Sequence, residues 1–338
     1  MMACVARLRN LAGVLALLAL ALASHAAAQQ PGPVDPNASA VSEQQLLQKL
    51  HTIRGLGSIP DTKSYTLEQL AGPAWRHYHE VTLRWIGAVV ILGVLALLVF
   101  FYLTRGVMRI EAGRSGRKIL RFGPYERFVH WMLAFCFVIL ALSGLNITFG
   151  RPLLLPLMSP EAFSTLSEWA KYAHNFLSFP FTLGVILMFF MWVAENIPNR
   201  VDIEWLKRGG GMIGHDHPPA YRFNGGQKIL FWIVFFGGSL VAISGYMLIF
   251  PFYGTDIHTM QLAEVGHSII AILFIGTMLL HIYIGSIGME GAFESMVDGT
   301  VDLNWAKEHH SLWVEEESAR ARARADTSPS RPTAVPGE

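Results

Sequence analysis

The sequence predicts an all-α integral membrane protein, because its charge is low and its apolar segments are long. Of 338 residues, 52% are hydrophobic and 15% are charged, whereas a soluble domain carries about 25% charged residues. Five apolar segments each approach the ~20 residues that a membrane-spanning helix needs; they cover residues 84–104, 128–149, 176–196, 229–250 and 266–288. The last four predict a transmembrane four-helix bundle, and the first predicts one extra N-terminal transmembrane helix. The formal net charge of +1 gives no indication of a nucleic-acid partner.

The N-terminal segment is typical of an exported protein. Residues 1–28 have the features of a secretory signal peptide: Arg7 and Arg9 at the charged start, an apolar stretch, and small residues up to Ala28. An uncleaved anchor helix is the alternative. Residues 29–83 are then expected to form a periplasmic segment.

The distribution of basic residues predicts the orientation in the membrane. Residues 105–127 hold seven arginines and lysines and residues 197–228 hold five, whereas 150–172 hold two and 251–265 hold none. Basic loops remain in the cytoplasm. We therefore expect a bacterial inner-membrane protein with a cytoplasmic basic loop at 105–127, a periplasmic mature N-terminus and a cytoplasmic tail at 289–338. The tail ends in an Arg-Ala repeat and a Pro/Ser stretch, which predict disorder.

Four histidines lie within or at the ends of the last four apolar segments: His130, His174, His267 and His281. Ionisable groups at membrane depth usually face a bundle interior and have a function. His267 and His281 are fourteen residues apart on one helix, which is ~21 Å along its axis and only ~40° short of four full turns. The predicted orientation places His174 and His267 near the outer surface, and His130 and His281 near the inner surface.

Two histidines at each level are the ligand set for two haems stacked across the membrane. Each histidine alone could be a structural residue, but neutral imidazoles are good iron ligands and bundle cores commonly hold such cofactors. Two axial histidines leave iron no open position, which suits electron transfer. Cys136 is the single thiol beyond the predicted signal peptide, and one thiol cannot hold an iron–sulfur cluster or a covalent haem. Residues 128–288 therefore predict a di-haem cytochrome b bundle.

Three sequence runs resemble the gamma subunit, the cytochrome b subunit, of respiratory formate dehydrogenase. The resemblance covers about residues 120–314, includes the fourteen-residue spacing from His267 to His281, and rests on the runs Arg127–Trp131, Phe223–Lys228 and Trp305–His310. The resemblance implies two haems b that receive electrons from an iron–sulfur beta subunit outside and deliver them to quinone inside. Formate would be oxidised on the catalytic alpha subunit, because this chain has no motif for a molybdenum or tungsten cofactor.

A quinone site is expected where the fourth span begins. Asn224 and Gln227 can hydrogen-bond a quinone carbonyl, glycine at Gly226 permits close approach of a flat ring, and His281 lies at the same predicted level. The alternative is structural, because Asn224 followed three residues later by Gln227 is also a helix capping box. The resemblance implies that this run lines the quinone pocket, and one run can serve both purposes.

Two other functions remain open from the sequence. The chain could be the cytochrome b subunit of another respiratory oxidoreductase, such as a nickel–iron hydrogenase or a thiosulfate reductase. It could also be a haem-free proton-coupled transporter that uses its intramembrane histidines as a relay. His215 and His217 lack a third metal ligand nearby in sequence and predict a solvated loop. His309 and His310 have no predicted chemical role.

Overall fold

The structure is a computed structural model, and the chain divides into two units, residues 1–78 and 79–338. The structure describes residues 72–211, 216–251 and 253–327. In the first unit the described element is α3, Gly72–His77. The predicted signal peptide, most of the predicted periplasmic segment, and His215 lie outside the described residues.

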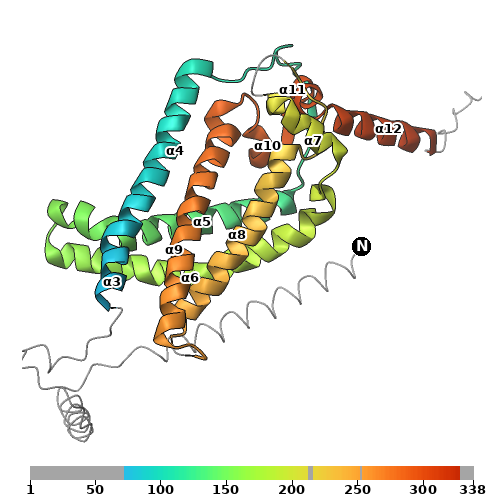
Figure 1. The fold of residues 1–338 in the computed structure, drawn as a ribbon. Coiled ribbons are helices and arrows are strands. Elements are labelled where there is room, and N and C mark those ends of the chain that lie inside the picture. The colour runs from blue at the N-terminus through green and yellow to red at the C-terminus, as the bar shows by residue number, and fades with distance from the viewer. Residues whose placement is uncertain (1–71, 212–215, 252, 328–338) are drawn as a thin grey trace, which may run out of the picture. The chain divides into compact units, whose positions relative to one another are not determined.

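Within the described residues, five helices are long and apolar enough to cross a membrane. The all-α membrane class is confirmed. The long helices are α4 Leu83–Arg105, α5 Pro124–Leu153, α6 Pro160–Trp192, α8 Gly225–Ile249 and α9 Ile257–Tyr283 (Figure 1). The shorter elements are η2 Tyr78–Thr82, β1 Lys118–Leu120, η3 Leu155–Leu157, η4 Val193–Asn196, α7 Arg200–Lys207, η5 Gly209–Gly211, η6 Ile284–Gly288, α10 Glu294–Val297, β2 Thr300–Asp302, α11 Leu303–His309 and α12 Ser311–Thr327.

Two spans begin earlier than their apolar segments suggest. The Ser159 hydroxyl accepts a hydrogen bond from the backbone N–H of Ala162 at 3.2 Å and starts α6 at Pro160. The Asp256 carboxylate starts α9 in the same way. Such caps satisfy the free N–H groups of a first turn, so a helix can continue beyond the hydrocarbon. His174 therefore lies well inside α6, although the predicted apolar segment begins only at residue 176.

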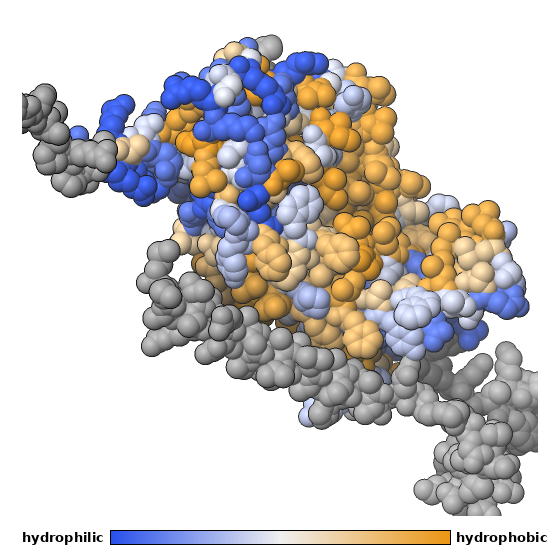
Figure 2. Space-filling model, turned by 180° about the vertical axis from the view of Figure 1, so that it is seen from behind, coloured by the Kyte–Doolittle hydropathy of each residue, from blue (hydrophilic) through white to orange (hydrophobic). Residues whose placement is uncertain are grey.

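The spans pack as two hairpins, α5 with α6 and α8 with α9, and α6 also contacts α8. Their shared core consists of apolar side chains from all four helices, including Val129, Phe181, Val185, Phe231 and Phe274. The opposite faces remain apolar and exposed, as lipid contact requires. Figure 2 shows a broad hydrophobic surface over the spans, with hydrophilic residues gathered at the end where α7 and α11 lie in Figure 1.

The extra helix α4 packs against α9, and residues in its first turns also contact α5. A side chain at Gly87 would meet the ring of Phe149 at 2.9 Å and the side chain of Ile272 at 3.3 Å, so glycine permits this close approach. The Nε of Arg84 donates to the carbonyl oxygen of Thr148 at 3.1 Å. The first span is therefore part of the same packed unit as the four-helix bundle.

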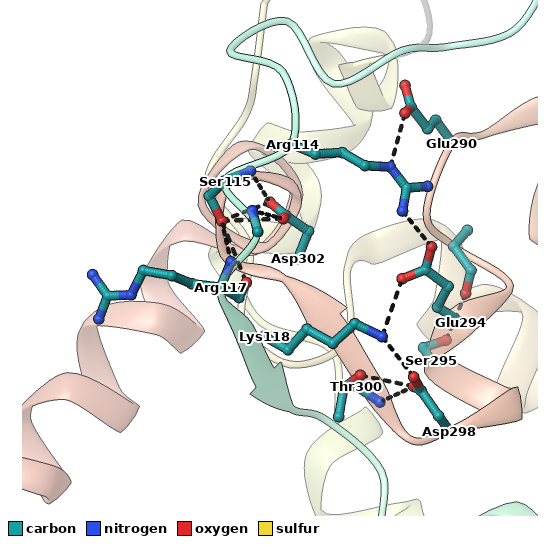
Figure 3. Close-up of polar contacts among 12 residues, drawn as sticks. Arg114, Ser115, Arg117, Lys118, Glu290, Glu294, Ser295, Asp298, Thr300 and Asp302 are labelled. Carbon is teal, nitrogen blue, oxygen red and sulfur yellow. Dashed lines mark hydrogen bonds and ion pairs between the residues drawn. The ribbon is translucent and has the colours of Figure 1, made fainter.

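The basic loop after α4 and the segment after α9 form one polar layer, which the sequence did not predict. Strands β1 and β2 pair antiparallel, with Ile119 opposite Val301. The Asp302 carboxylate accepts from the backbone N–H groups of Ser115 and Gly116, at 3.1 and 3.0 Å. Figure 3 shows this contact beside a second cluster that joins Arg114 and Lys118 to Glu290, Glu294 and Asp298.

The segment of the tail that contains the Arg-Ala repeat is helical, so the disorder predicted for this repeat is wrong. Helix α12 runs from Ser311 to Thr327 and includes the whole repeat. Alanine, arginine and glutamate are strong helix formers, and the buried side chains of Trp313 and Val314 hold the first turn in an apolar cluster with Trp305. The composition of the repeat predicts disorder because it is polar. It does not show that the two buried residues before the repeat, Trp313 and Val314, attach the helix to the rest of the protein.

Candidate functional site

The four intramembrane histidines meet in two pairs. His130 on α5 and His281 on α9 have ring centroids 6.2 Å apart, with an interplanar angle of 71°. His174 on α6 and His267 on α9 have ring centroids 6.1 Å apart, at 70°. The histidines that were predicted to lie at the same level of the membrane are thus paired in the structure. Each pair has one member on helix α9.

The separation within each pair fits two imidazoles on one iron. Two metal–nitrogen bonds of ~2 Å each place the ligating nitrogens ~4 Å apart. A five-membered ring with bonds of ~1.3 Å has its centroid ~1.1 Å from each nitrogen, so two opposed ligands have centroids ~6.2 Å apart. The observed separations of 6.1 and 6.2 Å agree with this value.

Hydrogen bonds fix which nitrogen of His267 carries the proton. Its Nδ1 lies 3.0 Å from the carbonyl oxygen of Val241 and 3.1 Å from the hydroxyl of Ser244. A carbonyl oxygen only accepts, so Nδ1 is the donor and bears the hydrogen. In a neutral imidazole with the hydrogen on Nδ1, Nε2 carries the lone pair that can bind a metal. The Val241 carbonyl orients the ring from the opposite side, as backbone carbonyls commonly do for metal-binding histidines.

His174 is oriented in the same way by a serine. Its Nδ1 lies 2.9 Å from the hydroxyl of Ser143. That hydroxyl lies 2.7 Å from the carbonyl oxygen of Ile139, to which it donates, and so it accepts from the imidazole. Nε2 of His174 therefore also carries a free lone pair. The outer pair therefore presents the ligating tautomer on both rings.

A repeated Ser-Gly dipeptide surrounds the outer pair. Each serine bonds one histidine and the next residue, Gly144 or Gly245, lets that ring approach the helix. A side chain at Gly144 would meet Cε1 of His174 at 3.3 Å, and one at Gly245 would meet Cε1 of His267 at 3.2 Å. These four residues are not among the predicted site residues, although the same dipeptide at corresponding depths of two spans is a signal that could have identified them.

The His130–His281 pair contains a buried nitrogen without a partner. Nδ1 of His130 has no hydrogen-bond partner among the residues that the structure describes. A buried polar atom without a partner is costly, by about 1–3 kcal/mol, and a metal bound to Nε2 of this ring would not satisfy it. The ring separation of 6.2 Å, which agrees with two imidazoles on one iron, is what suits this pair to an iron held by two histidines.

The family model for the prokaryotic cytochrome b561 matches residues 121–299, more than half of the chain and all four histidines. The chain belongs to this family. A cytochrome b carries haem b, which supplies a one-electron carrier when bound, and the paired imidazoles fit that group.

Curated relatives of this cytochrome are subunits of formate dehydrogenases. The formate dehydrogenase cytochrome b556(fdo) subunit of Escherichia coli is 31% identical over 212 residues, 62% of this chain and 97% of the relative. The nitrate-inducible cytochrome b556(Fdn) subunit of the same species is 28% identical, over 63% of this chain and 98% of the relative. A formate dehydrogenase cytochrome b556 subunit of Haemophilus influenzae is 29% identical, over 62% and 87%.

In this cytochrome, Asn224 and Gln227 form the capping box of α8. The Asn224 side-chain oxygen accepts from the backbone N–H of Gln227 at 2.9 Å, and the Gln227 side-chain oxygen accepts from the N–H of Asn224 at 3.1 Å. Side chains at Gly225 or Gly226 would meet Trp205 of α7 at 3.1 and 3.0 Å. The close packing of α7 on α8 therefore accounts for the two glycines. Any contact with quinone would have to be made by the amide groups of Asn224 and Gln227.

His217 and His309 lie together outside the spans. Their ring centroids are 6.0 Å apart, and Nε2 of His217 lies 3.2 Å from a carboxylate oxygen of Glu111. Burial, together with His217 and Arg121, lowers the pKa of His309 to about 4, so its ring is neutral at physiological pH. Among the described residues no group of three side chains is arranged to hold a metal ion.

Proposed function

We propose that this protein is the membrane cytochrome b subunit of a formate dehydrogenase and carries electrons from a periplasmic iron–sulfur subunit to quinone. The observation that carries the proposal is the presence of two histidine pairs, whose α9 members are fourteen residues apart, in a chain that matches cytochrome b subunits of formate dehydrogenases. The chain itself does not oxidise formate, and that reaction belongs to a separate catalytic subunit.

Two haems b form the electron path. His174 and His267 would hold the outer haem, and His130 and His281 would hold the inner one. The hydrogen bonds of Ser143 and Ser244 support the outer assignment, and the ring separation of 6.2 Å supports the inner one. Both levels share α9, where the two histidines are ~21 Å apart along the axis, so one iron cannot bind both.

Quinone receives the electrons near Asn224, Gly226, Gln227 and His281. The half-buried amide groups at the start of α8 hydrogen-bond the quinone oxygens, and protons enter from the cytoplasm. Because formate is oxidised on the other side of the membrane, turnover contributes to the proton-motive force. The protein resides in the bacterial inner membrane in contact with lipid, and its catalytic alpha and iron–sulfur beta partners lie on the periplasmic side.

The loop 105–127 and the tail are expected to face the cytoplasm. The loop contains seven basic residues, and such loops are retained inside. A cysteine introduced for Ser115 should resist an impermeant thiol reagent in intact cells and react after permeabilisation. A cysteine for exposed Glu161, near the opposite end of the bundle, should react in intact cells. The reverse pattern would invert the orientation and the direction of electron flow.

The partner enzyme is tested on the purified complex. Formate, hydrogen and thiosulfate are assayed separately with a quinone analogue, and a reduced-minus-oxidised optical spectrum is recorded. Formate alone should reduce haem b and then the quinone. Reduction by hydrogen, or activity with thiosulfate, would assign the chain to another respiratory oxidoreductase. A spectrum without haem b bands would contradict the cytochrome function itself and favour a transporter.

A further inference from the structure

Arg121 is a buried arginine beside the start of α8. It is 4% exposed. One of its terminal nitrogens, Nη2, lies 2.9 Å from the carbonyl oxygen of Arg222, 3.2 Å from Oε1 of Gln227 and 2.9 Å from Nε2 of His310. Its Nε is buried and has no partner among the described residues. All the acceptors that hold this guanidinium are therefore uncharged.

The partner His310 has a fixed tautomer. It is 1% exposed, and its Nδ1 lies 2.7 Å from the carbonyl oxygen of Tyr221. Because a carbonyl only accepts, Nδ1 carries the hydrogen and Nε2 accepts from Arg121. Burial and the charge of Arg121 lower the pKa of His310 well below its usual range, so the ring stays neutral. A residue of the C-terminal segment thus holds Arg121 in place.

The charge of Arg121 has no anionic counterpart in the described part of the chain. The rings of Phe122 and Trp305 lie 5.1 and 5.0 Å from its guanidinium carbon, and no carboxylate bonds it. Its neighbour Arg222, by contrast, pairs with Glu126 at 2.7 Å. Burial and the charge of Arg222 lower the pKa of Arg121 to about 9, which leaves it charged at neutral pH. A buried, uncompensated cation attracts any negative charge that forms nearby.

Arg121 also fixes the orientation of the Gln227 amide. Oε1 of Gln227 faces two donors, the backbone N–H of Asn224 and Nη2 of Arg121. A flipped amide would place an NH2 group against both donors, so the assignment is determined by the network. Within the described residues the Gln227 NH2 group has no partner and is not buried, and the same holds for the Asn224 NH2 group. Together the two amides present only donors.

We propose that Arg121 is a positioning residue of the quinone site: it locks Gln227 as a hydrogen-bond donor and stabilises the negative charge that a quinone oxygen gains on reduction. The inference rests on the proposed quinone function. The ligand class follows from the donor-only surface, because a quinone carbonyl oxygen is an acceptor that becomes more basic as electrons arrive. The capping box and the quinone role are then compatible, since the amide oxygens cap α8 and the NH2 groups remain free.

Gln227→Glu separates this role from capping. A carboxylate keeps both accepting contacts, because glutamate is itself a capping-box residue, and it neutralises Arg121. It cannot donate. In the purified complex we expect an unchanged melting temperature and haem content, and unchanged haem reduction by formate. The affinity for a quinone-analogue inhibitor should fall roughly tenfold, as expected for loss of one hydrogen bond, and reoxidation of the reduced haem by quinone should slow because the charge that develops on the quinone oxygen loses a donor.

Asn199→Asp is the matched control. Asn199 caps α7 at the same end of the bundle and accepts from Val201 and Asp202, so aspartate preserves the cap and adds the same charge without contacting Arg121. Inhibitor affinity should not change in this variant. A similar loss in both variants would mean that charge at this end is sufficient, and it would overturn the role of Arg121.

Two further variants complete the test. Arg121→Lys keeps a charge but not the planar donor group, and its inhibitor affinity should lie between those of the wild type and Gln227→Glu. Asn224→Ala removes the second NH2 donor. If Asn224→Ala weakens inhibitor binding and Gln227→Glu does not, the Arg121 inference is wrong and the quinone site stands. If neither variant affects binding, the proposed quinone site itself is wrong.

Discussion

A His174→Ala variant is expected to lose the outer haem and keep the inner one. Haem content should fall from two to one per chain, and formate-driven quinone reduction should be lost, because electrons enter through the outer haem in the proposed path. The reason is local: His174 and His267 have ring centroids 6.1 Å apart, and alanine leaves one of the two axial ligands. His130→Ala should instead remove the inner haem, whose remaining ligand is His281.

The measurement is a redox titration of the haem bands with haem quantification on the intact complex. His258→Ala is the control, because His258 is exposed near the outer end of α9 and lies far along that helix from His281. It should leave both haem signals unchanged. Retention of two haem signals and normal quinone reduction in either His174→Ala or His130→Ala would make the ligand assignment wrong.

A Lys228→Met variant is expected to lose about 3–5 kcal/mol of stability, because it leaves a buried carboxylate without its counter-charge. Lys228 Nζ lies 2.9 Å from the Asp202 carboxylate and 3.1 Å from the carbonyl oxygen of Ile197. The two side chains are only 4% and 10% exposed. This pair joins α7 to the first turn of α8, so its loss should also loosen the capping region there. Unfolding of the detergent-solubilised protein measures the effect.

A double variant shows whether the charge or the packing matters. Lys228→Met combined with Asp202→Asn removes both charges, keeps a side-chain oxygen to accept from the backbone N–H of Asn199 at 2.7 Å, and should recover most of the lost stability, as neutralised buried ion pairs often allow. Lys118→Met is the exposed control: its partner Asp298 lies 2.7 Å away, but both side chains are about half exposed, so the change should be much smaller. Equal loss in the single and double variants would instead assign the stability to the lysine's packing.

Much of the arrangement of the four histidines was predictable from the sequence, but their immediate surroundings were not. The fourteen-residue spacing on one helix and the basic loops together indicated which histidines share a level, and the structure brings those same pairs together. Ser143 and Ser244 escaped notice because a serine inside a span usually bonds its own helix. Both do so here and also bond a histidine on another helix.

The start of α8 shows the same division. The sequence left open whether Asn224 and Gln227 cap the helix or bind a ligand. The structure shows the capping box, and it also shows that the box consumes the amide oxygens and leaves the NH2 groups free. This orientation depends on Arg121, which is 106 residues away from Gln227 in sequence.

By itself the sequence determined the membrane class, the five spans and the levels of the four histidines. These follow from the requirement that a segment crossing lipid be ~20 residues of apolar helix with a fixed rise per residue. The tertiary structure alone decided the pairing of β1 with β2, the helical tail and the buried contact of Arg121 with His310. Arg121 and His310 are 189 residues apart, and such contacts depend on how the helices pack, which no local periodicity encodes.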